Sequence, residues 1–209
     1  MNIGISITGI SHLVDVYRPY PRSYKTCYEN FYTEVYDVLK NKNNITTYIT
    51  TYYSSEIDNI LKIYNPKKFQ IFNFNNSHQI VTVIKSLEQL RGEELDLIVC
   101  TRFDISFKES ILKTLTFDLT KFNFLFREEG YWESNKFVND CFYIFPYSML
   151  EDVIQACYNL LKTPPRPGLM DMHGLYTYLE QIVSADRVNI VNDAFMLSHE
   201  NEIYKLHRL

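Results

Sequence analysis

Glycine is scarce in this chain of 209 residues, which holds 6 glycines against 17 tyrosines and 14 phenylalanines. Phosphate-cradling loops need closely spaced glycines after a strand, and neither G-x-G-x-x-G nor G-x-x-x-x-G-K-[ST] occurs. The motifs H-E-x-x-H and G-x-S-x-G are also missing. These absences exclude the usual signatures of dinucleotide-binding proteins, P-loop proteins, zinc proteases and serine hydrolases.

Basic runs, paired cysteines and long apolar stretches are absent as well. A net charge of −4 without a run of Lys or Arg argues against a nucleic-acid partner. No apolar run reaches membrane-spanning length, and the first residues do not resemble a signal peptide. The four cysteines form no C-x-x-C pair, so we expect reduced core residues of a cytoplasmic protein: Cys27, Cys100, Cys141 and Cys157. Hydrophobic residues at 46% and charged residues at 22% indicate a soluble globular protein with no membrane span.

What the first half does contain is an alternation of short apolar strands and helical stretches. Apolar, β-branched runs predict strands at 2–8, 45–50, 69–74 and 95–100. Apolar residues at spacings of three and four predict helices with one buried face at 23–38, 56–63 and 80–91. This alternation predicts a single α/β domain with a Rossmann-like, mostly parallel central sheet flanked by helices.

The second half is less regular. Strands are expected at 122–126, 141–145 and 188–191, with helices at 148–162 and 171–182. Ser148 and Glu151 have the spacing of a capping box at the start of the first of these helices. The proline-rich stretch 163–168 is interpreted as a loop, because the residues after it are too few to fold alone.

Arg102 and Asp104 end the apolar strand that begins at residue 95. Residues two apart in an extended chain point to the same face, so the two side chains should lie together. They lie at the carboxyl edge of the sheet, where open α/β proteins bind their ligands. A structural ion pair that closes the strand is the alternative interpretation.

Three stretches resemble a known family: MNIGISITG with Arg-Ser-Tyr at a helix start, YITTYYSS, and LDLIVCTRFDISF. They resemble small GT-A-fold glycosyltransferases that use nucleotide-sugar donors and occur in bacterial surface-polysaccharide clusters and in chlorella-type large DNA viruses. The resemblance implies a nucleotide-binding half at 1–107 and an acceptor-side half at 108–209. It also implies a hexosyl- or deoxyhexosyltransferase that moves a sugar from a donor such as a UDP-sugar to a glycan or glycoprotein acceptor.

Carried over residue by residue, the resemblance assigns a nucleotide pocket and a metal ligand. The implied pocket residues are Thr8, Gly9 and Arg22, with Thr51 and Tyr52 against the base or ribose. Asp104 would hold Mn²⁺ or Mg²⁺, which can stabilise the leaving diphosphate as a Lewis acid. The chain departs from the Asp-x-Asp motif of the family, because Arg102 replaces the first acid. An arginine cannot bind a metal, but it can pair directly with a phosphate oxygen.

The remaining candidates come from the second half. Asp171 and His173 are candidates for a further metal ligand, with a helix cap and a surface histidine as the alternative interpretation. Asp140, just before a strand, is the first choice of general base. Glu128 and Glu129 stand behind it, although a solvated loop is the better explanation of those two.

Tyr131 and Trp132 offer aromatic faces that suit sugar rings, or they simply pack. Two other classes of function stay open: a glycoside hydrolase, which also uses paired carboxylates, and a non-catalytic nucleotide- or sugar-binding protein. A thermal shift with UDP or GDP and Mn²⁺ would separate them, since a hydrolase should ignore the nucleotide.

Overall fold

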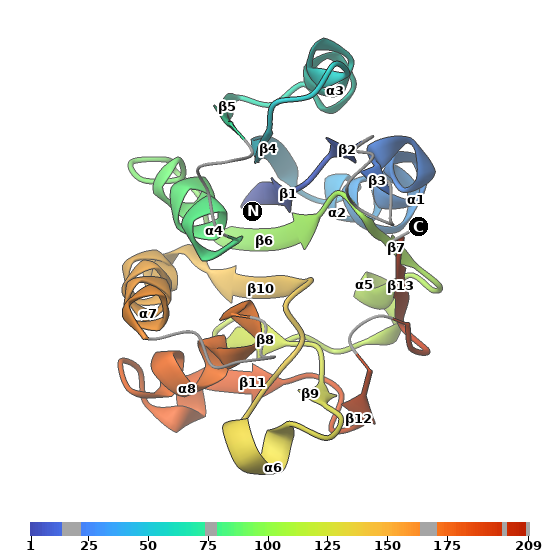
Figure 1. The fold of residues 1–209 in the computed structure, drawn as a ribbon. Coiled ribbons are helices and arrows are strands. Elements are labelled where there is room, and N and C mark those ends of the chain that lie inside the picture. Colours follow the sequence, from blue (N-terminus) through green and yellow to red (C-terminus); the bar gives the residue numbers. More distant parts are fainter. Residues whose placement is uncertain (14–21, 74–78, 164–170, 198–199, 208–209) are drawn as a thin grey trace.

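Seven strands form one continuous mixed sheet in the order β11-β8-β10-β6-β1-β4-β5 (Figure 1). The computed structural model describes residues 1–13, 22–73, 79–163, 171–197 and 200–207. Four neighbouring strands are mutually parallel, as the sequence predicts: β5 (Lys68–Phe72), β4 (Asn44–Tyr52), β1 (Asn2–Gly9) and β6 (Leu97–Arg102). Their carboxyl ends therefore share one edge of the sheet.

The other three strands come from the second half, and they run in both directions relative to the first four. They are β10 (Tyr143–Pro146), β8 (Phe122–Phe124) and β11 (Val188–Ile190). Strand β10 runs antiparallel to both β6 and β8, and β11 runs parallel to β8. The carboxyl end of β8 and the amino end of β10 consequently lie at the same edge as the carboxyl end of β6.

Helices cover both faces of the sheet (Figure 1). One face packs against α4 (Gln79–Glu88), α7 (Leu150–Lys162) and α8 (Leu175–Glu180). The other face packs against α3 (Ile57–Tyr64) and a segment predicted as one helix over 23–38. That segment is divided into η1 (Tyr24–Thr26), α1 (Tyr28–Phe31), the π-helical η2 (Tyr32–Tyr36) and α2 (Asp37–Lys40).

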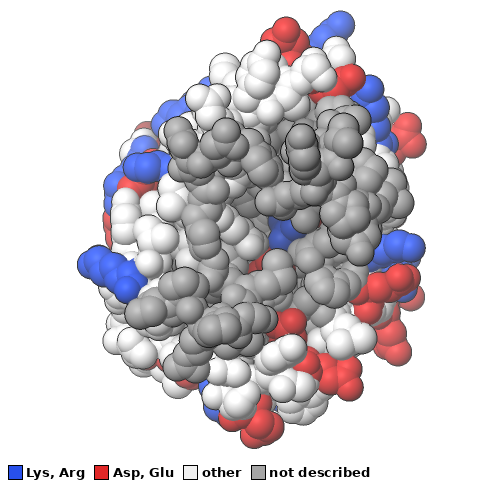
Figure 2. All heavy atoms as spheres, in the orientation of Figure 1, with Lys and Arg blue, Asp and Glu red and all other residues white. Residues whose placement is uncertain are grey.

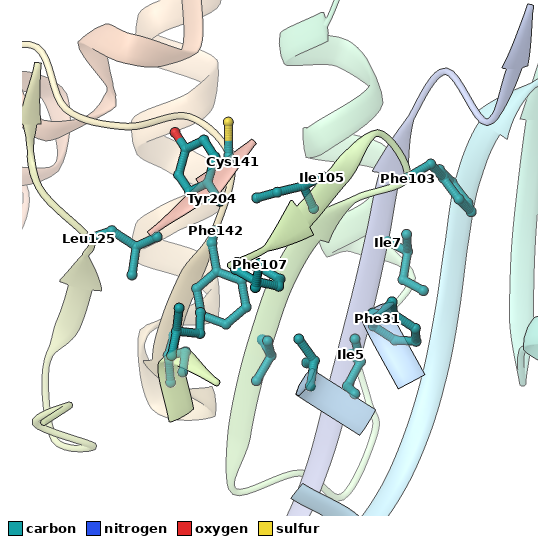
Figure 3. Close-up of a cluster of buried hydrophobic side chains, with 14 of the residues drawn as sticks. Ile5, Ile7, Phe31, Phe103, Ile105, Phe107, Leu125, Cys141, Phe142 and Tyr204 are labelled. Atoms are coloured by element: carbon teal, nitrogen blue, oxygen red, sulfur yellow. The ribbon is translucent and has the colours of Figure 1, made fainter. Parts of the chain in front are cut away.

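Alternation along the central strands separates two hydrophobic cores. Ile3, Ile5 and Ile7 of β1 point into the core on the α1 side, part of which Figure 3 shows with Ile105, Phe107 and Phe142. The residues between them face α4, where Ser6 bonds to Ser86. Full burial of one such isoleucine contributes about 1.5–3 kcal/mol, so the alternating pattern fixes which face of β1 meets which layer.

Short elements complete the described chain. Three two-stranded pairs are β2 (His12–Leu13) with β3 (Arg22–Ser23), β9 (Arg127–Glu128) with β12 (Phe195–Met196), and β7 (Ile105–Phe107) with β13 (Tyr204–Leu206). The remaining turns of helix are α5 (Ile111–Thr114), α6 (Trp132–Asn135), η4 (Tyr147–Met149), η5 (Asp171–Gly174) and η6 (Ala185–Arg187). None of the helices in the described ranges is both long and apolar enough to cross a membrane.

Several local predictions are confirmed and two are wrong. All four cysteines are buried and unbridged, and Asn65 ends α3 in a left-handed conformation with φ 41°. The capping box at Ser148 is wrong, because a 3₁₀ turn precedes α7 and places Ser148 before the N-cap residue Met149. Strand β11 is not the last strand, because β12 and β13 follow it.

Candidate functional site

Arg102 and Asp104 lie together where β6 ends, as their spacing predicts. Arg102 Nε donates to Asp104 Oδ1 and Nη2 donates to Oδ2, both at 2.8 Å. Phe103 between them points to the opposite face and packs its ring edge-on against Tyr64, with centroids 5.4 Å apart. The buried phenylalanine thus fixes the turn that holds both charged side chains on one face.

Asp140 binds the same guanidinium from the other side. Arg102 Nη1 donates to Asp140 Oδ2 at 3.1 Å. Gln79 Nε2, at the start of α4, donates to the same oxygen at 2.9 Å, and the Cys141 thiol donates to Oδ1 at 2.9 Å. Side-chain exposure is 10% for Arg102, 5% for Asp104 and 0% for Asp140. The antiparallel direction of β10 places Asp140 at this edge, so Arg102 lies between two buried carboxylates.

His173 and Glu128 extend this cluster. His173 Nε2 lies 3.7 Å from Asp140 Oδ2, and Nδ1 lies 2.7 Å from Glu128 Oε2 and 3.0 Å from the Val138 carbonyl oxygen. His173 is buried, so its interpretation as a surface histidine is wrong. We refer to the five residues together as the edge cluster: Arg102, Asp104, Glu128, Asp140 and His173.

Opposite charges outweigh burial in setting the protonation of this cluster. Burial alone would raise the pKa of Asp140, but the charges of His173 and Arg102 lower that pKa well below its usual range. Burial alone would lower the pKa of His173, but the carboxylates of Asp140 and Glu128 raise it. A carboxylate with a strongly lowered pKa is a weak proton acceptor, so this environment does not favour Asp140 as a general base.

One of the predicted nucleotide residues, Thr8, lies beside Arg102, and Gly9 and Thr51 lie at the same edge of the sheet. In register, Thr8 of β1 is paired with Arg102 of β6 on one side and with Thr50 of β4 on the other. Gly9 follows with φ 103°, a conformation that favours glycine, and apart from its two chain neighbours no atom of the described residues lies within 4 Å of where a Cβ would be. The Thr51 hydroxyl donates to the Gly9 carbonyl at 2.9 Å, which ties the ends of β1 and β4 together.

The other predicted nucleotide residues are placed differently. Tyr52 is buried, and its hydroxyl bonds to Thr82 of α4 at 3.3 Å, so the ring packs between the sheet and that helix. Tyr53, the next residue, is 68% exposed at this strand end, and it was not among the predicted nucleotide residues. The side chains of Arg22 and Asp171 lie outside the described residues, although β3 and η5 include their backbones.

The donor set does not fit a resident divalent metal. Both oxygens of Asp104 already accept N–H bonds from Arg102, which places a cation where the resemblance expects the ion. His173 Nδ1 is engaged with Glu128 and Val138. Within the described ranges, no three His, Cys, Asp or Glu side chains meet in a group that could hold a metal ion. We therefore derive no step through Mn²⁺ or Mg²⁺.

Tyr131 and Trp132 pack against residues that neighbour the edge cluster. Trp132 packs edge-on against Tyr176 at 5.0 Å, and the Arg127 guanidinium lies 5.0 Å from its ring. Tyr131, 43% exposed, stacks on Phe137 with centroids 6.0 Å apart. Trp132 therefore packs, whereas Tyr131 keeps exposed surface. Figure 2, in the orientation of Figure 1, shows basic and acidic atoms near the middle of the molecule.

No family model and no curated protein matches the chain. Among solved structures, the chain is similar to a nucleoside-diphosphate-sugar pyrophosphorylase from Vibrio cholerae RC9. The two share 15% sequence identity over 86% of this chain and 87% of that one, with a TM-score of 0.49. A likeness of this degree carries no argument about chemistry. The functional proposal rests on the geometry of the edge cluster and the residues beside it.

Proposed function

We propose that this chain is a glycosyltransferase that uses a nucleotide-sugar donor, with Arg102 as the group that binds the donor diphosphate. The observation that carries the proposal is the placement of Arg102, beside Thr8 and Gly9 at the carboxyl edge of three parallel strands. Ligands of open α/β sheets bind at this edge. The left-handed Gly9 leaves room for a ligand to approach the backbone.

The guanidinium retains donors for such a ligand. Arginine carries five N–H donors, and within the described residues Asp104 and Asp140 accept the bonds from Nε, Nη1 and Nη2. Each Nη nitrogen therefore keeps one N–H that these two carboxylates do not use. A guanidinium held by two carboxylates is already oriented before the donor binds, so little reorganisation accompanies charge development on the leaving diphosphate.

A non-catalytic nucleotide- or sugar-binding protein is the second candidate. The full burial of Asp140 and its three bonds are what a purely structural ion cluster would also have. This candidate predicts nucleotide binding without release of a sugar. A glycoside hydrolase is not favoured, because Arg102 binds both of the paired carboxylates, Asp104 and Asp140.

The test is nucleotide binding by titration calorimetry and thermal shift, with UDP and with GDP. A ligand at 100 times its Kd stabilises the folded chain by about 2.7 kcal/mol, which a melting curve resolves. Arg102→Lys keeps the charge but loses the fork geometry, so we expect at least tenfold weaker binding. Arg91→Lys is the matched control, because Arg91 pairs with Glu151 on the surface, and its binding should equal that of the wild type.

Two outcomes would count against the proposal. The first is a wild-type protein whose melting temperature neither nucleotide raises. The second is an Arg102→Lys variant that binds nucleotide as tightly as Arg91→Lys does. Repeating each titration with Mn²⁺ and with a chelator tests the metal requirement separately, and that requirement rests only on the family resemblance.

A further inference from the structure

Glu128 is the most accessible carboxylate of the edge cluster. Its side chain is 13% exposed, against 5% for Asp104 and 0% for Asp140. It lies just past the carboxyl end of β8, which the antiparallel β10 separates from β6. The sequence offered a solvated loop as an explanation of Glu128, and the structure instead places it against the buried cluster.

The other two carboxylates are committed to Arg102. Asp104 gives both oxygens to the guanidinium, and Asp140 accepts bonds from three different side chains. Neither can take up a proton without breaking a largely buried ion pair with Arg102, whose side chain is 10% exposed. A hydroxyl acceptor that approaches the donor must therefore give its proton to another group.

His173 holds Glu128 in place. The histidine is fixed by the Val138 carbonyl, 3.0 Å from Nδ1, and by the Phe137 ring, which stacks on the imidazole at 6.2 Å. Its Nδ1 lies 2.7 Å from Glu128 Oε2. The backbone of Glu128 is held as well, because its N–H donates to the Phe137 carbonyl at 2.9 Å. The carboxylate is thus oriented by a buried partner while part of it stays accessible.

An exposed aromatic surface adjoins this carboxylate. The Tyr131 N–H donates to the Glu128 carbonyl at 3.3 Å, and the Tyr131 ring stacks on Phe137, which stacks in turn on His173. Rings and carboxylate are therefore parts of one packed unit. Partly exposed aromatic faces suit the apolar side of a sugar ring, and a carboxylate suits its hydroxyl groups.

We propose that Glu128 is the general base of the acceptor side, that His173 is its positioning residue, and that the acceptor is a sugar hydroxyl lying against Tyr131. This inference rests on the proposed glycosyl transfer. The acceptor O–H gives its proton to Glu128 as its oxygen bonds to the anomeric carbon. The bond from that carbon to the diphosphate oxygen breaks, and its electron pair leaves with the diphosphate beside Arg102. Loss of one such general base lowers a rate by about 10²–10⁴-fold.

The test needs no knowledge of the natural acceptor. Release of UDP or GDP from a panel of nucleotide sugars is measured with water as the acceptor and then with added sodium azide. Azide attacks without losing a proton, so it does not need a base. We expect Glu128→Gln to release nucleoside diphosphate about 10²–10⁴-fold more slowly in water and to recover in azide, with UDP affinity unchanged. Glu151→Gln is the control, because Glu151 is 65% exposed and pairs with Arg91 on the surface, and it should match the wild type in both.

His173 is tested by two substitutions. Asn keeps an N–H donor close to the position of Nδ1, whereas Leu keeps none. We expect His173→Asn to retain more turnover than His173→Leu at equal UDP affinity, a difference that a purely structural role would not produce. Glu128→Gln turnover in water equal to that of Glu151→Gln would overturn the proposal. So would a wild type that binds UDP but releases none from any sugar donor, and that result would leave nucleotide binding standing. A wild type that binds neither UDP nor GDP would overturn glycosyl transfer itself.

Discussion

The Asp104–Arg102 ion pair is buried, so a substitution at Asp104 changes the stability of the protein as well as any binding at the site. The exposed strand-end ion pair that the sequence allows would contribute at most about 1 kcal/mol. The observed pair is enclosed, with Asp104 Oδ1 and Oδ2 each 2.8 Å from an Arg102 nitrogen. Removing one partner of a buried pair costs about 3–5 kcal/mol when the other charge is left uncompensated. Asp140 remains as the second partner of Arg102, so we expect the lower end of that range here. A lower melting temperature is therefore expected whether or not the pair takes part in catalysis.

We predict that Asp104→Asn lowers the free energy of unfolding by about 3 kcal/mol or more, measured by urea denaturation. In metal-free buffer its UDP affinity should equal or exceed that of the wild type, because one fewer carboxylate neutralises Arg102. Glu151→Gln, which removes a surface partner of Arg91, is the matched control and should change neither quantity appreciably. Weaker metal-free UDP binding by Asp104→Asn would mean that the orientation of Arg102 by Asp104 outweighs the neutralisation of its charge, contrary to this prediction.

At the scale of single elements, local signals predict the first half well. Apolar β-branched runs such as Ile3 to Ile7 identify their strands because the whole signal lies within the strand. The pairing of Arg102 with Asp104 follows from a spacing of two for the same reason. The contact of Arg102 with Asp140 could not be predicted, because it spans 38 residues and depends on the antiparallel direction of β10.

The restriction of sequence signals to local patterns also explains the elements and residues that were not predicted. Strands β12 and β13 have two and three residues, too few to show a periodic pattern. The burial of His173 depends on Phe137 and Val138, which lie on a distant loop. Gln79 carries no charge and begins an ordinary amphipathic helix, so nothing in the sequence marks it as a hydrogen-bond donor to Asp140.

The end of β4 supplies a prediction that separates two neighbouring tyrosines. Tyr53 is exposed at the carboxyl edge, and its N–H donates to the Phe72 carbonyl at 2.8 Å, which fixes its backbone. Tyr52 is buried and bonded to Thr82. We expect Tyr53→Ala to weaken UDP binding by about 1 kcal/mol or more, the scale of a base stacked on an aromatic ring, without lowering the melting temperature.

Tyr52→Phe is the comparison for Tyr53→Ala. It removes only the hydroxyl that bonds Thr82, so it should lower stability by about 1 kcal/mol and leave UDP affinity unchanged. Calorimetric titrations and melting curves of both variants supply the two quantities. If Tyr53→Ala bound UDP as tightly as the wild type, the base would have to lie away from this strand end.

At the scale of the whole molecule, the two halves of the chain share their structure. Strand β10 of the second half pairs with β6 of the first inside the seven-stranded sheet. Strand β13 returns to pair with β7, and the Tyr204 ring, buried in the core on the α1 side, lies 5.8 Å from Phe126. Neither half can therefore keep its core when the other unfolds, which supports the prediction of a single domain over 1–209.

We predict accordingly that the two halves unfold in one transition. Trp132, the only tryptophan, lies in the second half and reports on that half by fluorescence, whereas far-UV circular dichroism reports on the helices and strands of both. The two urea midpoints should coincide, because β10 loses its partner strand as soon as β6 is lost. Tyr204→Ala removes a buried ring at the junction and should move both midpoints down together, by a loss of about 3–5 kcal/mol. A Trp132 transition at clearly lower urea than the circular dichroism transition would instead mean that residues 108–209 unfold by themselves, and that the shared sheet does not couple the two halves of the chain.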